Sequence, residues 1–152
     1  MINFTKEEIS LCKQVVEKYR KNIVRGDWYA AEMFCPVKDI KAHLKMMGND
    51  YVEIGKKKYS IGLRTEISIM TPERQLNAIW FPLWTISDCL EFLEEKTTDW
   101  SLDKDIDREG RQTGKFSFWW MPSPKYKDNY RLGKTILEAC LKAVLAVLED
   151  NK

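Results

Sequence analysis

The sequence predicts a single α+β domain over residues 1–152, with a mixed or antiparallel sheet of about five strands packed by N-terminal and C-terminal helices. Three observations lead to this fold. The length of 152 residues fits one domain. Amphipathic helical patterns stand near both ends of the chain, and short β-type segments separated by Gly and Pro fill the middle. Short turns favour antiparallel or mixed pairing, in a sandwich of two or three layers.

The N-terminal part predicts two helices and a short strand. The first helix is expected over 5–26, because Thr5 and Glu8 have capping-box spacing and apolar residues then recur at steps of three and four. A short strand is expected at 28–31. A weaker helix follows over 36–47, with a proline in its first turn and a glycine after its end.

The middle of the chain is rich in β-type segments. Residues 51–63 read as a hairpin around a Gly-Lys-Lys turn, and 65–70 as a further strand. Residues 76–81 are apolar enough for a central strand. Pro82 is expected to stop that strand, because proline has no N–H to give to a sheet.

The last third alternates helix, loop, strand and helix. A helix is expected from a cap at Thr85 or Ser87 onward. Residues 97–114 read as a polar, charged loop that could include a short strand, and 115–121 as a strand of high β propensity. A final helix ends near 149, and its broad apolar stripe should lie flat on the sheet.

The cysteines and the hydropathy pattern indicate a cytoplasmic protein. No CxxC pair is present, and small secreted domains usually have a disulfide framework. We therefore expect reduced thiols, most of them on apolar helix stripes. No stretch approaches the ~20 apolar residues of a membrane span, so no membrane contact is expected. The four cysteines are Cys12, Cys35, Cys89 and Cys140.

The second half of the chain resembles small phage and prophage proteins built as an α/β/α sandwich. The resemblance rests on the strand-proline segment 79–84, the helix 86–93 and the closing Ala- and Leu-rich helix 133–144. It implies the fold and a setting in the cytoplasm of a host cell. It brings no catalytic residue, because these families mostly have no assigned activity.

Aromatic and basic side chains gather between residues 80 and 134. Residues 108–134 contain seven basic and two acidic side chains, and basic groups among aromatic rings can pair phosphates and stack bases. Strand alternation places Phe118 and Trp120 on one face and Trp119 on the other. Whether the rings form core or a recognition surface stays open at this point. The candidate ligand-binding residues are Trp84, Arg108, Arg111, Trp119, Lys125, Tyr126, Tyr130 and Arg131.

Motifs for catalysis or metal binding are incomplete. Gly133-Lys134-Thr135 has the end of a P-loop, but that loop needs a glycine at the position of Asp128, so ordinary helix entry is favoured. Residues 103–107 match the first calcium-loop ligands without the later glycine and glutamate. His43 is the only histidine, which argues against zinc; a dyad with Cys35 is a less favoured alternative. We expect no catalytic residue, metal or cofactor.

The sequence thus predicts a phage-type accessory protein that acts by binding and is not expected to be an enzyme. Its ligand is expected to be a nucleotide-like anion or a host protein. Binding of such a ligand would serve a role against host defence. One alternative is a structural homo-oligomer whose aromatic residues form a self-interface. The other is a small hydrolase or transferase that uses the carboxylates of 99–107. The formal charge of +2 argues against an extended nucleic acid.

Overall fold

A computed structural model describes residues 4–19, 28–32, 50–63, 80–121 and 129–150. These residues form three helices and two antiparallel sheets, so the predicted α+β class with helices toward both ends is confirmed. The described strands do not form the one sheet that was predicted. They divide between a four-stranded sheet, in the order β2-β3-β1-β4, and a three-stranded sheet, in the order β5-β6-β7.

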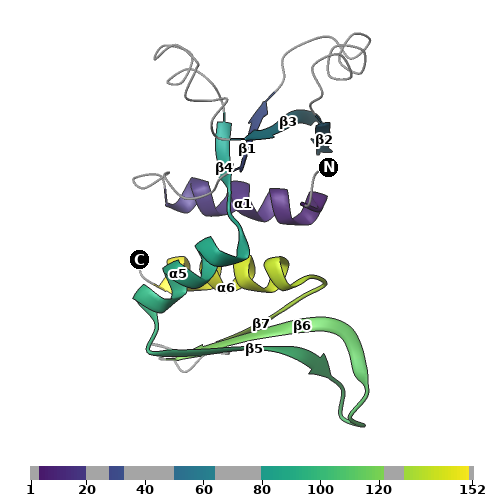
Figure 1. Cartoon of the computed structure of the whole chain (residues 1–152), viewed down its shortest axis with the longest axis vertical. Coiled ribbons are helices and arrows are strands. Elements are labelled where there is room, and N and C mark those ends of the chain that lie inside the picture. Colours follow the sequence, from purple (N-terminus) through teal and green to yellow (C-terminus); the bar gives the residue numbers. More distant parts are fainter. Residues whose placement is uncertain (1–3, 20–27, 33–49, 64–79, 122–128, 151–152) are drawn as a thin grey trace.

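The helices lie between the two sheets (Figure 1). Helix α1 (Lys6–Lys18) packs against β4 and β2 of the four-stranded sheet. Helix α6 (Ile136–Asp150) packs against α1 on one side and against β6 and β7 on the other, with α5 (Ile86–Lys96) beside it. The core therefore runs through the middle of the molecule, and α6 is its most deeply buried element.

The four-stranded sheet is built on the predicted hairpin. Strands β2 and β3 pair antiparallel around a turn in which Gly55 has a φ of +64°, a conformation that glycine adopts without steric cost. Strand β1, predicted as a short strand, pairs with β3 on one side and β4 on the other. The bounds are β1 Trp28–Glu32, β2 Asp50–Ile54, β3 Lys57–Leu63 and β4 Trp80–Leu83.

The prediction that Pro82 stops its strand is wrong. Pro82 lies within β4, where its Cα is paired with that of Tyr29 in β1. The sheet order explains why a proline fits here. Among the described strands, β4 is at the edge of its sheet and pairs only with β1, so a proline fits at a position from which β1 takes no N–H.

The prediction that 97–114 is mainly loop is wrong, and the short strand that the segment could include, around 100–102, is part of a longer strand. Residues Asp99–Ile106 form β5 and Gln112–Met121 form β6, which pair antiparallel as a long hairpin; Tyr130–Gly133 adds β7 on the other side of β6. The tight turn is held by Asp107, whose carboxylate accepts the N–H groups of Glu109 and Arg111, each at 2.9 Å.

Helices α1 and α6 run parallel. Near their N-terminal ends the Thr135 hydroxyl donates to the Glu8 carboxylate, and near their C-terminal ends Lys18 pairs with Glu149. The predicted capping box of Thr5 and Glu8 is confirmed. Helix α1 ends at Lys18, before the predicted end near 26. The predicted elements at 36–47 and 65–70, and residues 76–79, lie outside the described residues.

Candidate functional site

The predicted division of the aromatic strand is confirmed. Phe118 and Trp120 are 0% and 2% exposed and face the helices, whereas Trp119 between them is 36% exposed. Trp100 stacks on Phe118 from the neighbouring strand, with ring centroids 5.5 Å apart. The inner face of the β5-β6-β7 sheet is therefore core, and its other face is open.

The open face carries three large exposed side chains, Trp119, Met121 and Tyr130. Trp119 and Tyr130 are directly paired across β6 and β7. The Tyr130 hydroxyl donates to Asp105 at 3.0 Å, which fixes the ring across the sheet, and partial burial together with this carboxylate raises the pKa of Tyr130. Among the described elements, none lies over this face (Figure 1). We call it the outer sheet face; it comprises Asp99, Ser101, Asp103, Asp105, Lys115, Ser117, Trp119, Met121 and Tyr130.

Trp84 does not belong to any surface, contrary to the prediction. It is 2% exposed, and its ring packs edge-on against Phe92 with centroids 5.7 Å apart. Its backbone N–H donates to the Cys12 sulfur at 3.3 Å. Trp84 joins β4 to α5 and lies between the two sheets, where a large ring fills the core. We therefore remove it from the candidate site.

The predicted basic residues do not gather around Trp119. Arg108 and Arg111 lie at the tip of the β5-β6 hairpin, about 25 Å along β6 from Trp119 at the usual rise per strand residue. Arg131 belongs to the opposite face, where its guanidinium stands 5.7 Å from the centre of the Trp120 ring. Lys125 and Tyr126 lie outside the described residues.

Strand pairing also changes the local charge. The segment 108–134 has seven basic and two acidic side chains, but β6 pairs with β5, which contributes the aspartates of 99–107. Counted over 99–134, eight basic side chains face six acidic ones. Asp99, Asp103 and Asp105 share the face of Trp119, and among the described residues of this face Lys115 is their one basic neighbour. The exposed rings therefore have acidic neighbours, which disfavours an anion beside them.

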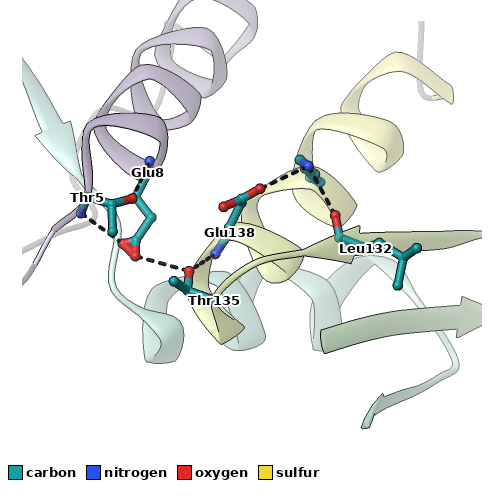
Figure 2. Close-up of polar contacts among 6 residues, drawn as sticks. Thr5, Glu8, Leu132, Thr135 and Glu138 are labelled. Carbon is teal, nitrogen blue, oxygen red and sulfur yellow. Dashed lines mark hydrogen bonds and ion pairs between the residues drawn. The ribbon is translucent and has the colours of Figure 1, made fainter. Parts of the chain in front are cut away.

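A second candidate site lies at the N-terminal ends of the helices, and the sequence did not reveal it. Glu8 of α1 is 3% exposed, and its two oxygens accept from the Thr5 N–H at 3.3 Å and from the Thr135 hydroxyl at 3.1 Å (Figure 2). The Thr135 oxygen in turn accepts the Glu138 N–H at 3.0 Å and so caps α6. One carboxylate thus serves the first turns of two helices.

The polar chain continues along α6. The Glu138 carboxylate is 3.1 Å from the Lys142 ammonium, which also donates to the Leu132 carbonyl of β7 at 3.1 Å (Figure 2). Glu138 is 5% exposed and the Lys142 side chain is 34% exposed, so the pair lies at the edge of the core. The only sequence signal for the network was the local Thr5–Glu8 spacing. Thr135 is 127 residues from Glu8, and no local pattern joins them.

A pocket of about 470 Å³ opens beside this network. Its walls come from Phe4 and the first turn of α1, the starts of α5 and α6, and the strands β1 and β6. Of the residues predicted for ligand binding, none that the structure describes lines it. The lining residues are Phe4, Glu8, Trp28, Thr85, Ile86, Phe116, Lys134, Thr135, Ile136 and Leu137.

The glycine of the P-loop-like segment has a packing role. A Cβ added at Gly133 would lie 2.3 Å from the Ala139 backbone nitrogen, so only glycine lets β7 approach α6 this closely. Since Thr135 caps α6, the segment is an ordinary helix entry, as favoured from the sequence. Asp128, whose carboxylate argued against a phosphate loop, lies outside the described residues.

The described cysteines are buried and unreactive in character. Cys12, Cys89 and Cys140 are free thiols with 0% exposure, in agreement with their predicted place on apolar helix stripes. Burial raises the pKa of Cys12 and of Cys140 from 9.0 to about 12, so both stay protonated at neutral pH. Cys35 and His43, which the sequence raised as a dyad, lie outside the described residues.

Two further findings concern the described part of the chain. No three His, Cys, Asp or Glu side chains in it come close enough together to hold a metal ion. None of its helices combines the length and apolar character that a membrane crossing requires.

Comparison with known proteins found no matching family, no matching curated protein and no matching solved structure, so the resemblance to phage proteins stays a prediction.

Proposed function

We propose that this protein acts by binding a partner protein through the outer sheet face. The observation that carries the proposal is the group of exposed Trp119, Met121 and Tyr130 on an open, hydrogen-bonded sheet. Aromatic residues and methionine are enriched at protein interfaces, and Trp and Tyr supply most of the energetic anchors. Contiguous exposed apolar groups of this kind are uncommon on surfaces that only meet water.

The surroundings of these rings indicate the chemistry of the partner. Asp99 and Asp103 are exposed along β5 beside Ser101, which is paired with Trp119. A complementary surface has an apolar centre and basic groups on the side that meets β5. The same aspartates give the nucleotide-like anion predicted from the sequence weaker support than a protein partner, and nothing in the described residues favours the carboxylate-based hydrolase.

The proposal is tested by photo-crosslinking in cells of the source organism. A photoreactive amino acid replaces Lys115, which is exposed on the outer sheet face, and in a matched control it replaces Glu94, which is exposed on α5. We expect an adduct with another protein from position 115 and none from position 94. Adding Trp119→Ser should remove the adduct, and Asp103→Lys should weaken it at least fivefold.

Four outcomes would contradict the proposal. Equal crosslinking from both positions would mean that the adduct is non-specific, and no adduct from position 115 would leave the face without a partner. An adduct of twice the mass of the chain would identify a second copy, which is the homo-oligomer alternative. The fourth outcome comes from a fluorescence titration with nucleotides. Quenching that occurs in the unmodified protein and is lost in Trp119→Phe would identify Trp119 as the quenched ring and favour the anionic ligand instead.

A further inference from the structure

The pocket beside Glu8 has the size and lining of a small-molecule site. Its volume of about 470 Å³ falls within the range of roughly 300–1,000 Å³ that is typical of ligand pockets. Such pockets are mainly apolar, with a few polar groups that orient the ligand. Here six of the ten lining residues are apolar or aromatic: Phe4, Trp28, Ile86, Phe116, Ile136 and Leu137.

The aromatic rings come from three separate elements. Phe4 precedes α1, Trp28 begins β1 and Phe116 lies in β6. Phe4 and Trp28 meet edge to face, with centroids 6.4 Å apart. Phe4, Trp28 and Phe116 are all partly buried rather than fully enclosed, so part of each ring stays accessible beside the core. Rings in this arrangement favour a flat aromatic guest.

The polar groups of the pocket define a second requirement on the ligand, which is a hydrogen-bond donor. Glu8 is a buried carboxylate, and each of its oxygens accepts one hydrogen bond from the protein. An ionised carboxylate has about four acceptor positions, so Glu8 retains capacity for a ligand N–H or O–H. Thr85 is less available, because its hydroxyl already donates to Asp88 at 2.9 Å.

The charges of the lining favour an uncharged ligand. Glu8 and Lys134 are its two charged residues, and their opposite charges leave the lining with no net formal charge. Glu8 is buried and repels an anion, whereas Lys134 is exposed. A neutral ring with a polarised N–H fits such a lining and gains the hydrogen bond to Glu8.

We propose that this pocket binds a small, uncharged, planar aromatic molecule whose N–H or O–H donates to Glu8. The ring lies against Phe4, Trp28 and Phe116, and the donor points to the carboxylate that already joins α1 to α6. The site is separate from the outer sheet face, since Phe116 belongs to the opposite face of β6 from Trp119. It does not depend on the partner proposed above.

Indole and indene form a matched pair of probes, because they share ring size and shape and only indole has an N–H donor. Binding to the full-length protein is measured by titration, followed through amide shifts in two-dimensional NMR. We expect indole to bind at least tenfold more tightly than indene, with the largest shifts at Phe4, Ile86 and Ile136. Loss of a hydrogen bond to a charged acceptor accounts for a difference of this size.

Two variants locate the site. Ile86→Trp enlarges a partly exposed residue at the pocket wall and should abolish binding of both probes, whereas Trp119→Ala on the outer sheet face should leave both affinities unchanged. Glu8→Gln should reduce the preference for indole over indene. Equal affinity for the two probes, shifts confined to residues away from the pocket, or no binding to the unmodified protein would each overturn the proposal; the shift mapping needs no variant to fold.

Discussion

Glu8 is expected to couple two helices that are far apart in the sequence, and a double-mutant cycle measures that coupling. Glu8→Ala removes the acceptor of the Thr5 N–H, worth about 1 kcal/mol as a helix cap, and the acceptor of the Thr135 hydroxyl, worth about 1.5–3 kcal/mol for a charged acceptor. We expect a loss of about 3 kcal/mol. Thr135→Ala removes the same bond and the cap of α6, at a cost of about 2.5 kcal/mol.

The double variant should lose less than the sum of the two, because the shared bond is removed only once. We expect a coupling energy of about 1.5 kcal/mol from urea unfolding followed by circular dichroism. Thr85→Ala is the matched control, since this threonine caps α5 by accepting the Asp88 N–H and bonds Asp88 rather than Glu8. Its effect should add to that of Glu8→Ala within about 0.5 kcal/mol. If the Glu8 and Thr135 variants are equally additive, the bond does not couple α1 to α6 and the reasoning fails.

Three further outcomes follow from burial, close packing and ionisation. Trp84→Ala should lower the free energy of unfolding by about 4 kcal/mol and Trp119→Ala by less than about 1 kcal/mol; similar losses in urea unfolding would contradict their assigned places. Gly133→Ala should cost about 3 kcal/mol, because its Cβ would lie 2.3 Å from the Ala139 nitrogen, and an unchanged melting temperature would show that β7 and α6 are not in close contact. Burial raises the pKa of Cys140 from 9.0 to about 12, so its contribution to the free energy of unfolding should be fully present below pH 9 and fall by about 1.4 kcal/mol per pH unit above it. Cys140→Ala should remove this contribution to the slope in a series of unfolding measurements at rising pH. An unchanged slope would refute the assignment.

The helices were predictable because their signals are local. Thr5 and Thr85 each start a helix with an acidic residue three positions later, and both capping boxes are present. The division of Phe118 from Trp119 was predictable for the same reason, since side chains alternate along a strand. Such features need only the neighbouring residues in the chain.

The errors came from features that depend on distant residues. The charges of 99–107 hid a strand, because that strand has one face in water and its apolar positions, Trp100 and Leu102, matter only beside Phe118. Trp84 looked like a surface ring until its packing on Phe92 and Cys12 was known. The distance between Arg108 and Trp119 depends on the length of the β5-β6 hairpin. The pocket forms only where α1, β1, α5, β6 and α6 meet.

The parallel pairing of α1 and α6 has a consequence for how the protein is made. Residues 127 positions apart have to meet before the side of α1 that packs on α6 is covered. Closing so long a loop is entropically costly and slows folding. On the ribosome, a chain that has not yet released residues 136–150 leaves that side of α1 uncovered. We therefore expect the nascent chain to be a chaperone and protease target until synthesis reaches α6.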